Sequence, residues 1–97
     1  MTLNNRQIKH LRGLSHDLHP VVMVGDKGLS ENVLEEIEHA LDHHELIKVR
    51  IRADREQRRE WMDQIATQCA AERVHAIGQV VCYFRRNPKK PTVELPH

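Results

Sequence analysis

The sequence predicts an α/β fold of the two-layer, α+β-like kind, with helices packed on a largely parallel or mixed sheet. The first observation is that helical and strand periodicities alternate along the chain in the order αβαβαββ. The second is that helices separate the first three strands, and right-handed crossovers bring such helices onto the sheet. The third is that 97 residues, 39% hydrophobic and 30% charged, suit one ordinary domain. We therefore expect a single domain over residues 1–97, with a basic C-terminal tail at about 86–97.

The first helix is predicted over about residues 5–15. Apolar residues recur there mostly at three- and four-residue steps, which places them on one face of a helix. These residues are Leu3, Ile8, Leu11, Leu14 and Leu18. Asn4 followed by Gln7 resembles a capping box, with Thr2 and Asn5 as competing caps.

A first strand is predicted at Val21–Val24, where Pro20 favours an extended entry. The run is apolar throughout, as expected of a strand that is covered on both faces or lies centrally in a sheet. Ser30 is a good N-cap for a second helix over about 31–44. The buried stripe of that helix comprises Val33, Leu34, Ile37, Ala40 and Leu41. Its carboxylates take the opposite face.

The clearest strand is Leu46–Arg52, in which apolar and basic residues alternate with period two. Lys48, Arg50 and Arg52 therefore share one face and are spaced about 6–7 Å apart along the strand. Because we expect the helices on the other side of the sheet, these cations should stand on an open face.

The C-terminal half predicts one more helix and a hairpin. The helix extends from Asp54, its N-cap, to about Ala71. Two strands follow, Val74–Ile77 and Val80–Phe84, joined by a tight turn at Gly78-Gln79. The last strand is apolar at both alternating sets of positions, so the sequence does not decide which of its two faces points into the core.

The segment Gly25-Asp26-Lys27-Gly28 joins the first strand to the second helix. Two glycines three apart let the backbone turn sharply and approach a ligand closely, because neither carries a Cβ. The loop and the start of the helix bring free backbone N–H groups and the positive end of a helix dipole to one place. This arrangement suits a phosphate, although a turn that simply needs positive φ would explain the same glycines.

The net charge of +1 hides an uneven distribution. Residues 30–45 hold carboxylates and no Lys or Arg; the carboxylates are Glu31, Glu35, Glu36, Glu38, Asp42 and Glu45. Basic residues gather in three other places: Arg6, Lys9 and Arg12; Lys48, Arg50 and Arg52; and Arg85, Arg86, Lys89 and Lys90. Such a surface can bind a polyanion locally. Solvated charge on exposed faces explains the pattern equally well.

The two cysteines, Cys69 and Cys82, lie far apart in apolar surroundings and form no CxxC motif. We expect buried thiols in a reducing compartment rather than a disulfide. No apolar stretch approaches the roughly 20 residues that span a bilayer, and we find no signal-peptide core. A cytoplasmic protein without membrane association is therefore expected.

Eight histidines raise the question of a metal site. His39 and His43 are four apart and share a helix face at a spacing that can hold Zn²⁺, and His16 and His19 form a second pair. Neither pair has an obvious third ligand, so we expect no metal and no other cofactor. The chain also contains no GxSxG, HExxH or Walker motif, and we expect no catalysis.

Several short motifs occur together along nearly the whole chain. They are Leu11-Arg12-Gly13-Leu14, the run from Pro20 to Ser30 with its GxxG loop, Glu45-Leu46-Ile47-Lys48-Val49, Ile77-Gly78, an Arg after Tyr83-Phe84, and Leu95-Pro96. Each is short, but the joint pattern is specific. It resembles the CRM domain and, more narrowly, the single-domain bacterial YhbY-type proteins.

The resemblance implies a four-stranded mixed sheet with helices packed on it, similar to the C-terminal domain of bacterial translation initiation factor three. It also implies RNA binding, since the GxxG loop is similar to the one with which KH domains clamp a nucleic-acid backbone. Bacterial members associate with precursors of the large ribosomal subunit, and plant relatives with several copies assist group II intron splicing. One departure is Asp26, where the family often has Lys or Asn. A carboxylate there repels a phosphate and leaves Lys27 as the loop's cation.

We therefore expect a non-catalytic, monomeric protein that binds ribosomal RNA in precursors of the large subunit and assists ribosome assembly. The predicted RNA-binding residues are Gly25, Asp26, Lys27, Gly28, Lys48, Arg50, Arg52, Arg6, Lys9, Arg12, Arg85, Arg86, Lys89 and Lys90. Aromatic residues make up 3% of the chain, which favours recognition of phosphate and shape over base stacking. The alternative is a protein–protein adaptor whose acidic second helix docks a ribosomal protein.

Overall fold

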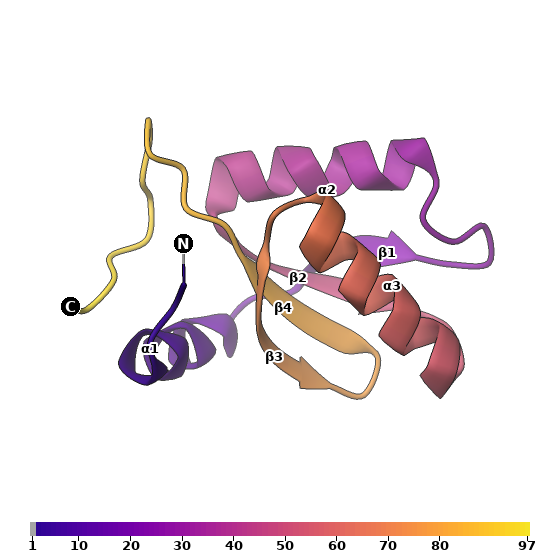
Figure 1. The fold of residues 1–97 in the computed structure, drawn as a ribbon, viewed down its shortest axis with the longest axis horizontal. Helices are drawn as coiled ribbons and strands as arrows, with labels where there is room; N and C mark the ends of the chain where they lie inside the picture. Colours follow the sequence, from indigo (N-terminus) through magenta and orange to yellow (C-terminus); the bar gives the residue numbers. More distant parts are fainter. Residues whose placement is uncertain (1) are drawn as a thin grey trace.

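A computed structural model describes residues 2–97, which form three helices and a four-stranded mixed sheet (Figure 1). The elements are α1 (Asn5–Ser15), β1 (Pro20–Val24), α2 (Glu31–His44), β2 (Leu46–Ile51), α3 (Arg55–Gln68), β3 (Glu72–Ile77) and β4 (Val80–Phe84). The predicted fold class and element order are confirmed. Met1, the first residue of the expected domain, lies outside the described residues.

The sheet has the strand order β1-β2-β4-β3. β1 runs parallel to β2, and β4 runs antiparallel to both β2 and β3. Both outer strands are irregular, because the pairing register shifts between Pro20 and Val22 on β1 and between Arg73 and His75 on β3. These two irregularities shape the exposed end of the sheet.

Each helix begins at a residue that the sequence marks as a cap. Asn4 Oδ1 accepts from the Gln7 N–H at 2.8 Å, and the Gln7 side chain accepts from the Asn4 N–H at 3.0 Å, which completes a capping box. Ser30 caps α2 and Asp54 caps α3 with their side-chain oxygens. None of the helices in the described part of the chain has the length and apolar character to cross a bilayer.

The main hydrophobic core lies between the sheet and the two helices α2 and α3. Its fully buried members include Val24, Ile37, Leu41, Ile47, Val49, Ile51, Ile65, Val81 and Tyr83. The buried hydroxyl of Tyr83 donates to the Met62 carbonyl at 2.9 Å, which satisfies the polar atom that this ring brings into the core. This layer matches the expected packing of helices on one face.

A second, smaller core lies on the opposite face of the sheet, under α1. Its buried members are Leu3, Leu11, Leu46, Val74, Cys82 and Phe84. The expectation that all helices share one face therefore holds for α2 and α3 but not for α1. The physical reason is β4, which is buried on both faces and needs apolar cover on each.

The two ends of the described chain meet in this second core. Val93 and Leu95 pack against it, and the Gln7 side chain donates to the Pro96 carbonyl at 3.0 Å. Figure 1 shows the N- and C-terminal segments at the same end of the molecule, with the loop between β1 and α2 at the other end. The C-terminal segment is thus folded onto the domain.

The cover provided by α1 and the C-terminal segment is incomplete. Val21, Met23 and Ile77 are 52%, 55% and 66% exposed at the far end of the sheet. Lys48 is half-buried and Arg50 is exposed. The open face that the alternating strand predicted is therefore present, but it is limited to one end of the sheet.

Candidate nucleic-acid interface

The glycine loop is a tight turn closed by its own backbone. The Gly28 N–H donates to the Gly25 carbonyl at 2.9 Å, and the Ser30 N–H donates to the Gly28 carbonyl at 3.1 Å. Within residues 2–97, the N–H groups of Asp26 and Lys27 have no acceptor, and both residues are exposed. The donors open to a phosphate are therefore those at the tip of the turn, while that of Gly28 is already used.

The two glycines of the loop have different structural needs. Gly28 has φ +68°, and a Cβ added there would lie 2.9 Å from Cζ2 of Trp61 on α3. Gly25 has no positive φ, and a Cβ added there would meet nothing within 4 Å among the described residues. The fold requires glycine at position 28 but leaves open space at position 25, where a ligand backbone has room to approach.

The strand cations lie where the alternation predicted them. Lys48 and Arg50 flank the buried Val49, so they face away from α2 and α3, and neither forms an ion pair within the described residues. Arg52 lies just beyond β2, where its N–H donates to the Val24 carbonyl at 2.9 Å and the residue is exposed. These side chains retain their full capacity to donate to an anion.

The first-helix cations are distant from the glycine loop. Arg6 and Lys9 are exposed on α1, at the opposite end of the molecule (Figure 1). Arg12 lies against β3, and its Nε–H donates to the Val74 carbonyl at 3.4 Å. The molecule is 39 Å long, so α1 and the loop contact different parts of any shared ligand.

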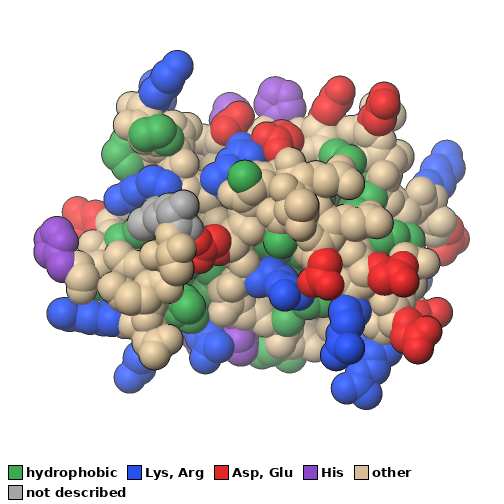
Figure 2. Space-filling view, in the orientation of Figure 1, with side chains coloured by type: hydrophobic (Ala, Val, Ile, Leu, Met, Phe, Trp, Pro, Cys, Tyr) green, Lys and Arg blue, Asp and Glu red, His purple; other side chains and the backbone are tan. Residues whose placement is uncertain are grey.

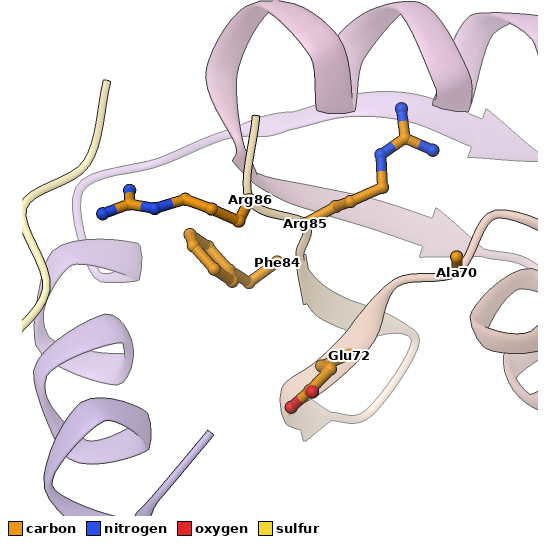
Figure 3. A pocket seen from close by; sticks show the side chains of 5 residues that line it. All are labelled: Ala70, Glu72, Phe84, Arg85 and Arg86. Carbon is orange, nitrogen blue, oxygen red and sulfur yellow. The ribbon is translucent and has the colours of Figure 1, made fainter. Parts of the chain in front are cut away.

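Arg85 and Arg86 leave the end of β4 in opposite directions (Figure 3). The Arg85 guanidinium reaches α2, where it forms ion pairs of 2.8 Å with both Glu38 and Asp42. It also donates to the Cys69 carbonyl at 2.8 Å. The Arg85 side chain is therefore a link between β4 and α2, with its donors already used inside the fold.

Arg86 belongs to a cluster built on the buried carboxylate of Glu45. This residue ends α2 with φ +61°, and its carboxylate accepts backbone N–H bonds from Asn87 (2.6 Å), Thr92 (2.7 Å) and Val93 (2.8 Å). The Arg86 guanidinium completes the cluster by forming an ion pair of 3.2 Å with the same carboxylate. Burial raises the pKa of Glu45, but the three N–H bonds and the Arg86 charge outweigh it and hold this pKa below its usual value.

Lys89 and Lys90 lie in an ordered turn within the same segment. The Asn87 side-chain oxygen accepts from the N–H groups of both lysines, at 3.0 and 3.2 Å. Their side chains remain exposed. The predicted tail residues thus separate into two arginines that hold the fold together and two lysines that face solvent.

Sequence reasoning missed a row of arginines on α3. Arg55, Arg58 and Arg59 line a shallow groove of about 390 Å³ together with Arg73 of β3. Arg73 pairs with Asp63 at 2.8 Å. Figure 2 shows basic side chains gathered over the N-terminal end of α3, with acidic ones beside them. The available signal was the spacing of 55, 58 and 59, which places these arginines on one helix face.

The histidine and cysteine side chains show no shared centre. Among residues 2–97, no group of three or more His, Cys, Asp or Glu is arranged to hold a metal ion. The rings of His39 and His43 meet edge to face, with centroids 6.3 Å apart. Cys69 and Cys82 are free and buried, as predicted. Burial, followed by the neighbouring Glu38, raises the pKa of Cys69 to about 11, which keeps it a thiol at neutral pH.

The CRS1/YhbY (CRM) domain family matches residues 3–85. The chain belongs to this family. The resemblance inferred from the short motifs is thereby confirmed, and it extends over the sheet, the glycine loop and all three helices that the structure describes.

The CRM domain has relatives that match over nearly their whole length. An RNA-binding protein from Haemophilus influenzae is 44% identical over 96 residues, which is 98% of this chain and 96% of that protein. A probable RNA-binding protein from Pseudomonas aeruginosa is 41% identical over 90 residues, covering 92% and 86% of the two chains.

A solved structure shares the fold of this CRM domain. The solution structure of a hypothetical Staphylococcus aureus protein, described as a candidate RNA-binding protein, matches with a TM-score of 0.82 at 28% sequence identity. The match covers 98% of this chain and 100% of the other.

The CRM domain therefore presents its predicted site residues in separate groups. The loop tip offers backbone donors, the exposed end of the sheet offers Lys48 and Arg50, and α1 and the Lys89-Lys90 turn lie elsewhere. Arg85 and Arg86 stabilise the fold through their ion pairs with Glu38, Asp42 and Glu45.

Proposed function

We propose that this CRM domain binds RNA through the tip of the glycine loop and the exposed end of the sheet, without catalysing a reaction. One observation carries the proposal. Within residues 2–97, Lys48 and Arg50 have no acidic partner on the sheet face, while Arg85 and Arg86 are held by carboxylates of the fold. Unpaired cations and exposed backbone donors are the two kinds of group that phosphate contacts use. The names of the Haemophilus and Pseudomonas relatives support RNA as the polyanion.

The loop and the strand have distinct roles in this proposal. The free N–H groups of Asp26 and Lys27 orient the RNA backbone, and the open space at Gly25 lets a phosphate approach them. The Asp26 carboxylate repels a phosphate, so the loop contributes hydrogen bonds to the RNA more than positive charge. Lys48 and Arg50, with Arg52, supply the charge that holds the neighbouring phosphates.

The RNA that we propose is ribosomal RNA in precursors of the large subunit, bound by a monomer in the cytoplasm. The CRM family supports this target, since the bacterial proteins that the chain resembles associate with such precursors. The two free thiols are consistent with a reducing compartment. The role that follows is assistance in ribosome assembly.

The double variant Lys48→Ala, Arg50→Ala tests this interface. Each phosphate contact contributes about 0.7–0.9 to the slope of log affinity against log salt, so the variant should flatten the slope by about 1.4–1.8. The measurement is the dissociation constant for structured ribosomal RNA at several salt concentrations. Stability should change little because both residues are outside the main core.

The matched control is Arg55→Ala, Arg59→Ala, which removes two arginines from the groove beside α3. We expect the control to keep the wild-type slope. A wild-type slope near zero would exclude phosphate binding altogether. If the salt slope falls only in the control variant, the RNA interface lies on α3 and not on the sheet.

A second candidate function is a protein–protein adaptor, favoured by the acidic face of α2. Glu31, Glu35 and Glu36 are exposed and form no ion pair within the described residues. Charge reversal of Glu35 and Glu36 distinguishes the two functions, and it leaves Glu38, which holds Arg85, intact. RNA binding predicts that the reversed protein still co-sediments with large-subunit precursors. Loss of co-sedimentation, with Lys48→Ala, Arg50→Ala retaining it, would favour the adaptor.

A further inference from the structure

The exposed end of the sheet contains a groove of about 280 Å³ beside the last turn of α1. It is lined by Ser15, His16, Pro20, Lys48, His75, Ile77, Val80 and Cys82. No carboxylate is among these residues. The groove therefore combines an apolar floor with one lysine and two imidazole rings, which come from different elements.

Two irregularities of the strands build the groove. Pro20, Lys48, Cys82 and His75 form one row across all four strands. At the outer ends of the row the pairing register shifts, just after Pro20 and just before His75. Each shift corresponds to one extra residue on the edge strand. An extra residue of this kind bends the strand and re-aims the next side chain. It lets His75 line the groove although its neighbour Val74 is buried on the same face of the sheet.

The next row across the sheet also combines a cation with apolar side chains. Arg50 pairs with Val80, and Val80 pairs with Ile77, so a second cation lies beside two apolar side chains. Lys48 and Arg50 form no ion pair in the described part of the chain. Cations at one side of an apolar groove match a nucleotide, whose base has flat faces that stack on apolar or aromatic groups and whose phosphate is charged.

The groove cannot receive a base from an intact double helix. Bases in paired RNA are stacked inside the helix, and the deep major groove keeps protein side chains away from them. Unpaired bases can be turned out and stacked on aromatic side chains, histidine included. The volume of about 280 Å³ lies just below the range of about 300–1,000 Å³ for small-molecule pockets, which leaves room for one base.

We propose that this groove binds one unpaired nucleobase of the RNA, with His16 and His75 at its sides and Lys48 at the adjoining phosphate. The inference rests on the proposed RNA-binding function and adds the chemical class of the contact. The three aromatic residues of the chain favour recognition of phosphate and shape over base stacking. Imidazole rings brought together by the fold supply the missing flat surfaces.

The test compares two RNAs that share one stem: a fully paired duplex and the same duplex with a single bulged 2-aminopurine. We expect the wild-type protein to prefer the bulged RNA, and the 2-aminopurine fluorescence to change on binding. His75→Ala should reduce this preference by about 5-fold or more, because one stacking contact contributes at least about 1 kcal/mol. Affinity for the paired duplex should remain unchanged.

His39→Ala is the matched control, since that histidine is exposed on α2. Ile77→Glu is a second variant whose folding is not at issue, because Ile77 is 66% exposed. The new carboxylate should weaken the binding of the bulged RNA by repelling its nucleotide, and Ile77→Lys should retain most of that affinity.

The outcomes separate this inference from the proposed function. A wild-type protein that binds both RNAs equally, with a normal salt slope, would overturn the base-binding groove and leave phosphate binding intact. If His75→Ala weakens the binding of both RNAs equally, the base-binding groove is likewise overturned and phosphate binding stays intact. Absence of binding to either RNA would instead overturn the RNA-binding function itself.

Discussion

Glu45→Gln is expected to release the C-terminal segment from the domain and to reduce the free energy of unfolding by about 3 kcal/mol. The Glu45 carboxylate is fully buried and accepts three backbone N–H bonds from residues 87, 92 and 93. A glutamine side chain offers one acceptor oxygen, turns an N–H₂ toward the remaining donors and leaves Arg86 without its charged partner. Urea denaturation measures the loss, and limited proteolysis reports on residues 86–97.

The control for this variant is Glu35→Gln, which removes an exposed carboxylate from the same helix. Its effect should remain within about 0.5 kcal/mol. A Glu45→Gln protein as stable as wild type, with the C-terminal segment still protected from protease, would contradict the structural role of the carboxylate.

The same carboxylate makes a pH-dependent contribution with a defined sign. The pKa of Glu45 is lowered from its usual 4.5, so the folded state holds the proton more weakly than the unfolded state. Its stabilisation is fully present above pH 4.5 and is lost as the pH falls through the lower, folded-state pKa. The difference in unfolding free energy between wild type and Glu45→Gln should therefore shrink in acid.

Gly28→Ala is the second substitution with a large expected effect. The position has φ +68°, which costs an L-residue about 1–2 kcal/mol, and a Cβ there would lie 2.9 Å from the Trp61 ring. Overpacking adds roughly 1–3 kcal/mol, so the total loss should reach about 2–5 kcal/mol. Trp61 is the single tryptophan of the chain, and its fluorescence in a urea titration reports both the unfolding and the displaced ring.

Gly25→Ala is the matched control within the same loop. It meets no atom within 4 Å among the described residues and needs no positive φ, so the stability should change by less than about 0.5 kcal/mol. Its affinity for RNA should nevertheless fall by about 5-fold, because the methyl group takes the space that a phosphate approaches. Unchanged RNA affinity would place the RNA away from the loop, and equal stability of the two variants would contradict the packing of Gly28 on Trp61.

Local patterns were sufficient to predict the helices and strands. The capping box of Asn4 and Gln7 and the alternation around Lys48 act over a few residues, and both occur as expected. The side of the sheet on which α1 packs could not be predicted in the same way. It depends on the two-sided burial of β4, a strand whose apolar run has no preferred face in the sequence.

The candidate site was harder to predict because charge patterns do not distinguish free side chains from paired ones. Arg85 and Arg86 look like the other basic clusters, yet their partners Glu38 and Glu45 lie more than 40 residues earlier. Glu45 was grouped with the carboxylates of the second helix, whereas the fold buries it. The register shift before His75 also leaves no trace in the sequence, since it arises from strand pairing.

The meeting of the two chain ends beside α1 has a consequence for longer architectures. Both segments lie at the end of the molecule opposite the glycine loop (Figure 1). A peptide linker that joins two such domains would therefore start and finish away from the loop, without crossing the exposed sheet. Copies connected in tandem keep every loop accessible, so one polypeptide can hold several RNA segments at once, with an effective concentration set by linker length.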